Sequence, residues 1–538
     1  MANFDHIGWQ AESKTGAVAA GGAGAVAAGV AILNQGGNAA DAAAGTILAL
    51  NVTDHGACSI GGEVPVLIWN GQEVKSLSGM GRAPRAQPAI DWYMQNGIPD
   101  KDIKMAPVPS VVDLCITMLQ QYGTLSFETI IAPTLDLLDT GAEDWHPNLA
   151  KTLRRLVEEE QRTHGNREEK LQAACDRFYG RHPERNDIAA ELVAFYLEQG
   201  GFLRREDLAA HQTLIEAPVS THYKGYEVYK CGPWTQGPYL CQALRLLEGF
   251  DLQEMGHLSA DYIHAAIEAI KLATADRDAY YGDPLFVDVP MDALLSDEYT
   301  KLRQPLINPA QASPDVRPGD PINMAALKAG GVYRPGIGGT TTCVVADKDG
   351  MVVSATPSAN VYHAGGSGST GVSYGNRLRS LNTTPGHPNC IAAGKRPRIT
   401  LTPTLVTRDG KPVIAVSVAG GDLQDQVTLN VLLSHIDFGL APHEAVVVPR
   451  FATSHHQGSF DPNPDRNAAF VSRGGVTLHK DVPESVRDEL TSRGHKLRVV
   501  GGAIAHPVML VIDHKNGIVH GAGDPRVGRS VGVLKPVP

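Results

Sequence analysis

The sequence lacks the features that mark disulfide-stapled, zinc-binding and membrane-spanning proteins. Its seven cysteines are odd in number, widely spaced and never arranged as Cys-x-x-Cys, which argues against a disulfide framework and against a zinc site. The apolar stretch from Ala17 to Leu33 is short for a membrane span, and Asp5 and Glu12 precede it where a signal peptide is basic. We therefore expect a cytoplasmic protein whose cysteines are mostly small buried residues.

Positive charge is also scarce. The chain has 47 Lys and Arg residues against 58 Asp and Glu residues, a formal net charge of −11. Binding to nucleic acid or to an anionic membrane needs clustered cations, so both partners are disfavoured. With 538 residues, of which 43% are hydrophobic and 20% charged, the chain has the composition of a globular protein with one large unit or two interlocked ones. We expect a small molecule as its partner.

The first half of the chain is typical of helices. Between Ala25 and Val52, two Ala/Leu-rich segments are separated by Gly-Gly-Asn, and Asn38 is suited to cap the second helix. The charged region from Lys151 to His211 indicates solvated helices. The glycine spacing that begins at Gly22 is similar to a dinucleotide-binding loop, but no apolar strand is expected before it, so we disfavour that interpretation.

The second half is typical of strands. Residues 301–337 are rich in Pro, Gly and Ala and indicate a linker, after which β-branched apolar runs dominate. Three pairs of these runs are joined by Asp-Gly or Asn-Gly turns, which accept the positive φ of tight hairpins. The turns are Asp347-Lys348-Asp349-Gly350, Arg408-Asp409-Gly410 and Lys515-Asn516-Gly517. A helical first half followed by a hairpin-rich second half predicts helices packed on sheets.

The segment IGGTTTCVVADKDG, residues 337–350, allows two interpretations. It is either the first strand of a hairpin or a place where a chain break makes Thr340 a new amino terminus. A threonine hydroxyl needs a base beside it to act as a nucleophile, and a free α-amine, with an ordinary pKa of about 7.7–8.0, is such a base. Gly338 and Gly339 tolerate the twisted backbone that an N-to-O acyl shift requires. Thr-rich edges after glycine turns are common, so the segment alone leaves both interpretations open.

Eight motifs occur along the chain in a recognisable order. They are ILNQGGNAADAAAGTILALNVTDHGACSIGGE from Ile32, GRAP from Gly81, PVSTHYKGYEVYKCGPWTQGP from Pro218, TADRDAYYGDPLFVDVP from Thr274, the segment at 337–350, KRPRITLTPT from Lys395, SVAGGD from Ser417 and HGAGDPR from His520. This order resembles the γ-glutamyltranspeptidase family of N-terminal-nucleophile hydrolases over nearly the whole chain.

The resemblance implies a fold and a processing site. The fold is α+β, a four-layer αββα sandwich of two intertwined subunits made from one precursor. The family's Thr-Thr-x-x-x-Val-Val-Asp-x-x-Gly register places the nucleophile at Thr340. Autoproteolysis between Gly339 and Thr340 would give a large subunit of 339 residues (1–339, with the linker at about 301–339) and a small subunit of 199 residues (340–538). These would form a heterodimer, with a dimer of heterodimers as an open alternative.

The resemblance also assigns supporting roles. Thr356, Ser358 and Asn360 match a T-x-T-x-N pattern whose second hydroxyl supports the nucleophile, and Ser358 keeps that oxygen without the methyl group. Gly420 and Gly421 match the Gly-Gly pair that forms the oxyanion hole, where one backbone N–H donor is commonly worth about 3 kcal/mol.

The expected chemistry needs no metal or organic cofactor. Thr340 Oγ attacks an amide carbonyl, its α-amine carries the proton, and the ester intermediate passes to water. The adjacent His455 and His456 are similar to a metal-ligand pair, but the family often carries histidines in this neighbourhood, so we disfavour ligation.

The substrate-binding positions depart from the family pattern. The family's arginine before Ala-Pro falls on Met80, although Arg82 lies close by. Its acidic run becomes Gly-Asn-Arg-Leu-Arg-Ser at 375–380, and its serine pair becomes Ile399-Thr400. Because Arg379-Ser380 replaces an acidic pair, a substrate ammonium would lose its partner and meet repulsion.

An anionic acyl group without an α-amine fits this pocket better, because an arginine fork binds a carboxylate bidentately. The candidate substrate-binding residues are Arg377 and Arg379 first, then Arg396 and Arg398, with Asn360, Thr400 and Asp422. Each arginine has the alternative of being a surface residue in a loop.

The leading hypothesis is a self-processing amidohydrolase that cleaves a small carboxylate-bearing amide of the oxamate type to ammonia and acid. The alternatives are a γ-glutamyl hydrolase or transferase acting on glutathione-type substrates, and an acylase that releases a dicarboxylic acyl group, of the cephalosporin type. A third is an unprocessed homologue that keeps the fold without catalysis.

Overall fold

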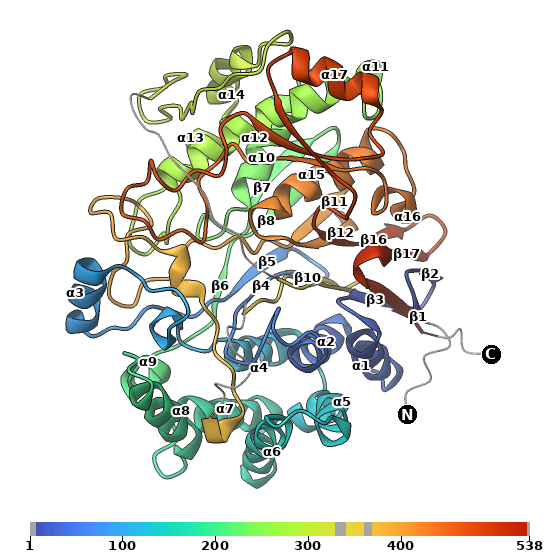
Figure 1. Ribbon diagram of the computed structural model, residues 1–538. Helices are drawn as coiled ribbons and strands as arrows, with labels where there is room; N and C mark the ends of the chain where they lie inside the picture. The colour runs from blue at the N-terminus through green and yellow to red at the C-terminus, as the bar shows by residue number, and fades with distance from the viewer. Residues whose placement is uncertain (1–6, 329–339, 360–367, 535–538) are drawn as a thin grey trace.

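Two β-sheets stacked face to face form the centre of the molecule, and helices cover both outer faces (Figure 1). The computed structural model describes residues 7–328, 340–359 and 368–534. The order of layers is therefore helix, sheet, sheet, helix, which confirms the predicted α+β, four-layer αββα fold.

The first sheet is antiparallel at every neighbouring pair and has eight strands within the described ranges. In spatial order these are β1 (Ile7–Gly8), β18 (Ser530–Val533), β3 (Gly16–Ala20), β9 (Cys343–Asp347), β10 (Val352–Ala355), β4 (Val64–Trp69), β5 (Val74–Gly79) and β6 (Leu214–Glu216). Strand β9 thus lies between a strand from the beginning of the chain and its own hairpin partner. The segments before and after position 339 are interlocked in one sheet, as the resemblance implied.

The second sheet, also antiparallel, has seven strands in the same part of the chain. Their order is β2 (Gln10–Ser13), β17 (Ile518–Gly523), β16 (His506–Asp513), β12 (Lys411–Ala419), β11 (Thr404–Arg408), β8 (Tyr226–Lys230) and β7 (Val219–Tyr223). A small third sheet joins β13 (Phe451–Thr453), β14 (Gly475–His479) and β15 (Lys496–Val500).

Helices α1, α2 and α4 cover the outer face of the first sheet, with α5 to α9 beyond them (Figure 1). Their bounds are α1 (Ala23–Asn34), α2 (Ala39–Thr53), α4 (Val111–Tyr122), α5 (Phe127–Thr140), α6 (His146–Arg162), α7 (Arg167–Tyr179), α8 (Asp187–Glu198) and α9 (Arg205–Ala209). Helices α10 (Pro238–Leu247), α12 (Ala260–Tyr280) and α15 (Gln424–Ile436) form the layer on the second sheet. The remaining helices are α3 (Gln87–Asn96), α11 (Leu252–Met255), α13 (Met291–Leu294), α14 (Asp297–Arg303), α16 (Pro442–Ala445) and α17 (Glu484–Ser492).

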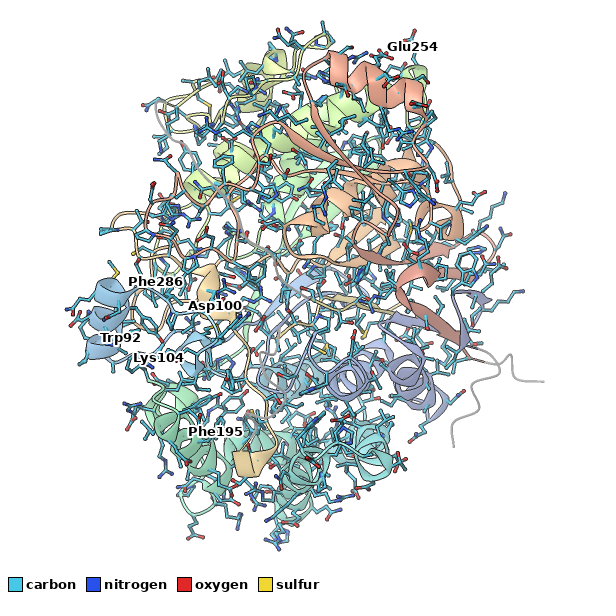
Figure 2. All side chains as sticks on the ribbon, in the orientation of Figure 1. Trp92, Asp100, Lys104, Phe195, Glu254 and Phe286 are labelled. Carbon is cyan, nitrogen blue, oxygen red and sulfur yellow. The ribbon has the colours of Figure 1, made fainter. Side chains whose placement is uncertain are left out.

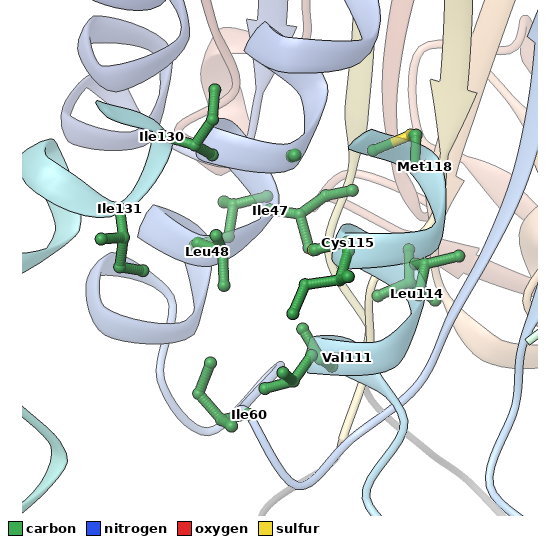
Figure 3. Close-up of a cluster of buried hydrophobic side chains, with 14 of the residues drawn as sticks. Ile47, Leu48, Ile60, Val111, Leu114, Cys115, Met118, Ile130 and Ile131 are labelled. Atoms are coloured by element: carbon green, nitrogen blue, oxygen red, sulfur yellow. The ribbon is translucent and has the colours of Figure 1, made fainter. Parts of the chain in front are cut away.

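Apolar side chains fill the gaps between the layers. Along β9, Val344 and Ala346 belong to the cluster between the two sheets, whereas Cys343 and Val345 belong to the cluster under the first helical layer. Successive strand residues point to opposite faces, so a continuous apolar run is what a strand buried on both sides requires. Figure 3 shows part of the helical cluster, where Leu48 of α2 packs among apolar side chains of α2, α4 and α5.

The predicted local signals have the expected structures. Asn38 caps α2, accepting a hydrogen bond from the Asp41 amide at 3.0 Å in a capping box. The three hairpins form as β9–β10, β11–β12 and β16–β17. In the second of these turns, Asp409 and Gly410 both have positive φ, 52° and 70°.

One expectation about the glycine spacing at Gly22 is wrong. The apolar strand β3 does precede helix α1, although Gly16–Ala20 is too rich in Ala and Gly to have been predicted as a strand. Strand β3 pairs antiparallel with β18 and β9, and α1 leads into a second helix rather than a parallel strand. The βαβ unit that a dinucleotide loop needs is therefore not formed here.

All seven cysteines are unpaired; six are buried and Cys390 is half-buried. No helix in the described ranges is long and apolar enough to cross a bilayer.

Leu48→Ala tests the helical cluster. Leu48 is fully buried, so the truncation loses apolar burial and leaves a cavity, and we expect the free energy of unfolding to fall by about 3 kcal/mol. Denaturant titration followed by circular dichroism measures the change. Leu197→Ala on the surface, where Leu197 is 45% exposed, is the matched control and should change stability little. Equal losses in the two variants would contradict this description of the core.

Candidate active site

Thr340 lies three residues before the start of β9 and is buried, with 5% of its surface exposed. The amide of the next residue, Thr341, donates to the carbonyl of Pro357 at 2.9 Å, just beyond β10. On the other side, the Gly21 amide donates to the carbonyl of Thr342 at 3.2 Å. The backbone that follows Thr340 is therefore held between the ends of β3 and β10.

Gln424, at the start of α15, is the side chain that contacts the Thr340 hydroxyl, at 3.2 Å. With the Gln424 amide nitrogen donating to the carbonyls of Thr400 (2.9 Å) and Val418 (3.2 Å), its oxygen accepts from the Thr340 hydroxyl. This orientation satisfies every group, because Thr400 and Val418 offer acceptors only. The sequence did not indicate Gln424, since a glutamine in a helix carries no distinctive pattern.

A second contact fixes Thr341, the neighbour of the candidate nucleophile. Its hydroxyl donates to a carboxylate oxygen of Asp54, and Arg529 Nη1 lies 3.5 Å from the same oxygen. A Cβ at Gly21 would lie only 2.2 Å from the Thr341 hydroxyl, so only glycine allows this approach. Asp54 and Arg529 come from opposite ends of the chain, which is why sequence reasoning missed them.

Gly420 and Gly421 form the turn between β12 and α15, three or four residues before Gln424. Both have positive φ, 155° and 60°, and a Cβ on Gly420 would lie 2.7 Å from the Cβ of Ala505. The turn therefore requires glycine at Gly420 on both conformational and steric grounds. Through Gln424, it adjoins the Thr340 hydroxyl, which is the neighbourhood expected of an oxyanion hole.

The two hydroxyls of the T-x-S pattern have different surroundings. Thr356 Oγ1 lies 3.0 Å from Ser417 Oγ, on the neighbouring sheet. Ser358 Oγ accepts a hydrogen bond from Arg377 Nη2 at 2.7 Å. Ser358 follows Pro357, which contacts Thr341, and it binds Arg377. It thus links the nucleophile segment to Arg377, a first-ranked candidate for substrate binding.

Arg377 and Glu63 form an ion pair with no solvent exposure of either side chain. Arg377 Nε donates to Glu63 Oε1 at 2.5 Å, and its guanidinium stacks on the ring of Phe460 with 4.8 Å between the guanidinium carbon and the ring centroid. The backbones of Glu63 and Ser358 exchange two hydrogen bonds, at 2.8 and 2.9 Å. Glu63, Ser358 and Arg377 therefore form a closed triangle beside the nucleophile segment.

Two atoms of this ion pair are left without a partner. Arg377 Nη1 and Glu63 Oε2 are buried and make no hydrogen bond to any residue that the structure describes. Burial raises the pKa of Glu63, and the Arg377 guanidinium counteracts part of that rise. Unsatisfied buried charge is costly, so both atoms are positioned for a polar ligand.

The other candidate arginines differ from Arg377. Arg379 forms a partly exposed ion pair with Asp100 at 3.2 Å, and Figure 2 shows Asp100 on the side of the molecule that carries α3. Arg396 pairs with Asp283 at 2.8 Å and with a second carboxylate. Arg398 is buried and donates to Ser459 at 2.6 Å. The expected reversal of local charge is therefore offset, because Arg377, Arg379 and Arg396 each have a carboxylate partner.

Thr400 and Asp422 have distinct environments. Thr400 is fully buried, and its hydroxyl has no hydrogen-bond partner, while its carbonyl contacts Gln424. Asp422 accepts from Arg277 Nη1 at 2.6 Å and from both the hydroxyl and the amide of Ser459. Burial alone would raise the pKa of Asp422, but Arg277, His456, Arg398 and the Ser459 hydrogen bond together hold that pKa well below its ordinary value. Asp422 is thus engaged by protein groups, whereas Thr400 presents a polar atom near Thr340.

Four further residues named from the sequence are Gly339, Asn360, Met80 and His455. Gly339 and Asn360 lie outside the described residues. Met80 is buried in the apolar cluster between the sheets, where the family's arginine would stand. His455 hydrogen-bonds the Asp315 carbonyl and the Gly474 amide, at 3.1 and 2.9 Å. Over the described ranges, no group of three His, Cys, Asp or Glu residues is arranged to hold a metal ion.

Glu63→Ala tests the buried ion pair. Removal of the carboxylate leaves Arg377 as an uncompensated buried charge, so we expect the free energy of unfolding to fall by about 3–5 kcal/mol. Glu73→Ala is the control, because Glu73 pairs with Lys75 on the surface with 56% of its side chain exposed. Denaturant midpoints for both variants measure the difference, and a Glu63→Ala protein as stable as the control would show that the pair is not buried as described.

Comparison with known proteins agrees with this geometry. A family model described as Gamma-glutamyltranspeptidase matches residues 25–144 and 144–534. The glutathione hydrolase proenzyme of Escherichia coli (strain K12) is 30% identical over 505 residues, 83% of this chain and 81% of that protein. The acylase ACY 1 proenzyme of Pseudomonas sp. (strain V22) is 28% identical over 529 residues, 89% of this chain and 87% of that protein.

Among solved structures, the cephalosporin acylase from Bacillus halodurans aligns with a TM-score of 0.80 and 25% identity, over 98% of this chain and 97% of that one. The family model covers far more than half of the sequence, and the fold match extends over nearly all of it. The chain belongs to the γ-glutamyltranspeptidase family of N-terminal-nucleophile hydrolases, enzymes that hydrolyse amide bonds and arise by autoproteolysis of a precursor into a large and a small subunit.

Proposed function

We propose that the protein is an amidohydrolase of small carboxylate-bearing amides of the oxamate type, with Thr340 as its nucleophile after cleavage of the Gly339–Thr340 bond. The observation that carries the substrate class is Arg377 Nη1, a buried guanidinium nitrogen without a hydrogen-bond partner in the described part of the chain. A substrate carboxylate would satisfy this donor with a charge-assisted hydrogen bond. The Thr400 hydroxyl, without a hydrogen-bond partner among the described residues, offers a second polar contact beside Gln424.

The proposed reaction proceeds in two steps. Thr340 Oγ attacks the amide carbonyl, the α-amine of Thr340 accepts the hydroxyl proton and passes it to the departing ammonia, and an ester to Thr340 forms. Water then attacks this ester and releases the acid, regenerating the hydroxyl. Backbone N–H groups of Gly420 and Gly421 stabilise the oxyanion in both steps. Gln424 holds the hydroxyl in place, since its side chain contacts Thr340 in the described structure.

A specific observation also favours the γ-glutamyl alternative. Glu63 Oε2 is buried and has no hydrogen-bond partner within the described ranges, so it offers a carboxylate oxygen to a substrate ammonium group. A γ-glutamyl group carries both a carboxylate and an ammonium, and it would use Arg377 and Glu63 together. The relatives named glutathione hydrolase proenzymes agree with this alternative, and the acylases agree with a dicarboxylic acyl group. The oxamate type is preferred because Arg379-Ser380 replaces the acidic pair that would hold a substrate ammonium, and the nearby Asp100 carboxylate is already paired with Arg379.

The cellular location and the assembly stay predictions. The location predicted from the sequence is cytoplasmic. The family pairs one large subunit with one small subunit. A dimer of this heterodimer is a further prediction.

Substitution of Arg377 tests the substrate class. With Arg377→Gln, we expect kcat/KM for oxamate to fall about 10- to 100-fold relative to kcat/KM for acetamide in the same variant, since a charge-assisted hydrogen bond contributes about 1.5–3 kcal/mol. The ratio of the two amides cancels any loss of folded enzyme. Ammonia release measures both rates.

Arg408→Gln serves as the control, because Arg408 lies on an exposed hairpin and donates to the Tyr226 hydroxyl. It should leave the oxamate-to-acetamide ratio unchanged. Faster hydrolysis of a γ-glutamyl anilide than of oxamate by the wild-type enzyme would reject the oxamate proposal in favour of the γ-glutamyl alternative.

A further inference from the structure

One buried arginine differs from all others in the described part of the chain. Nine arginines there are buried, and eight of them have a carboxylate within 4.0 Å. Those eight are Arg155, Arg177, Arg277, Arg303, Arg377, Arg396, Arg450 and Arg529. Arg398, only 4% exposed, is the one without such a partner among the described residues. A buried charge without a counter-ion is expensive, so this exception calls for a ligand.

The Arg398 side chain makes few hydrogen bonds with the described protein groups. Its Nη1 donates to Ser459 Oγ at 2.6 Å, which is its one side-chain hydrogen bond within the described ranges. Ser459 in turn donates from its hydroxyl to Asp422 Oδ1 at 2.5 Å, and its amide donates to Asp422 Oδ2 at 3.0 Å. Ser459 therefore joins Arg398 to Asp422 without neutralising the guanidinium.

The charges around Arg398 do not compensate for it. Arg277 and Arg466 face it as cations, and Asp278 and Asp422 face it as carboxylates. Both carboxylates are already engaged by Arg277, at 2.8 and 2.6 Å. Burial and the neighbouring Arg277 lower the pKa of Arg398 to about 10, which is the direction that an uncompensated cation shows. The surplus positive charge suits one further anion.

Arg398 adjoins the candidate catalytic groups from two directions. Thr400 follows Arg398 by two residues. The Thr400 carbonyl accepts a hydrogen bond from the side-chain amide of Gln424, which also contacts the Thr340 hydroxyl. Through Ser459, Arg398 reaches Asp422, the residue directly after Gly421. Arg377, by contrast, is joined to the nucleophile segment through Ser358. The two arginines thus belong to separate hydrogen-bonded groups beside Thr340.

We propose that Arg398 and Ser459 form a second carboxylate-binding subsite, separate from Arg377, that takes an additional carboxylate of the substrate. This inference rests on the proposed amidohydrolase function and extends it to substrates with two carboxylates. An arginine fork binds a planar carboxylate through two parallel N–H···O bonds, and Arg398 has unused N–H groups. The additional carboxylate belongs either to the acyl group or to the leaving group.

Direct binding to the processed enzyme tests the subsite independently of turnover. The probes are succinate, which has two carboxylates, and propionate, which has one, titrated calorimetrically at constant ionic strength. We expect wild-type enzyme to bind succinate at least about tenfold more tightly than propionate, and Arg398→Gln to abolish that difference. Arg398→Lys, which keeps the charge without the fork, should retain part of it. Arg408→Gln should behave as wild type, and fragment formation on a denaturing gel verifies folding.

Kinetics then distinguish the two sources of the carboxylate. If it belongs to the acyl group, Arg398→Gln lowers kcat/KM for the 1-monoamide of propane-1,2,3-tricarboxylic acid, which has two acyl carboxylates, relative to glutaramate, which has one. If it belongs to the leaving group, the variant lowers kcat/KM for oxalyl-glycine relative to N-methyl oxamate. Equal succinate affinity in wild type and Arg398→Gln would overturn the subsite. If Arg377→Gln left the preference for oxamate over acetamide unchanged, while succinate binding still depended on Arg398, only the proposed function would be overturned.

Discussion

The pairing of β9 on both of its edges is the constraint on which the rest of the site depends. Strand β3 from the start of the chain and β10 from its hairpin hold β9 in the middle of an eight-stranded sheet. Thr340 therefore lies three residues before a strand that cannot move without breaking the sheet, and the Thr341 contacts to Pro357 and Asp54 extend this restraint to the residue next to Thr340. A nucleophile created by chain cleavage needs such support, because cleavage removes the covalent anchor on one side.

Buried ion pairs determine how the surroundings of Thr340 are divided. Most buried arginines in the described structure are neutralised by carboxylates, as Arg396 is by Asp283. Arg377 is neutralised by Glu63 but its Nη1 has no hydrogen-bond partner among the described residues, where Arg398 also forms no ion pair with a carboxylate. These two exceptions lie in separate groups beside the nucleophile. The proposal of an anionic substrate rests on these two arginines and not on the number of arginines in the sequence.

Local patterns predicted much of the fold, and long-range contacts explain what was missed. Asn38 and the Asp-Gly and Asn-Gly turns act through neighbouring backbone groups, so the cap and hairpins were predictable. Strand β3 was not, because Gly16–Ala20 has low strand propensity and is stabilised by pairing with β9 and β18. Asp54, Glu63 and Gln424 were missed for a related reason. Each contacts a residue more than 80 positions away, and nothing in its own neighbourhood indicates that contact.

The mass of the smaller fragment tests the central claim most directly, that the chain is cleaved before Thr340 and that Thr340 is the nucleophile. After incubation of the purified precursor, intact-mass spectrometry and amino-terminal sequencing should find a fragment of 199 residues that begins Thr-Thr-Thr-Cys. Thr340→Ala should remain a single chain of 57.2 kDa without amidase activity. A fragment that begins elsewhere, or processing that persists in Thr340→Ala, would contradict the account.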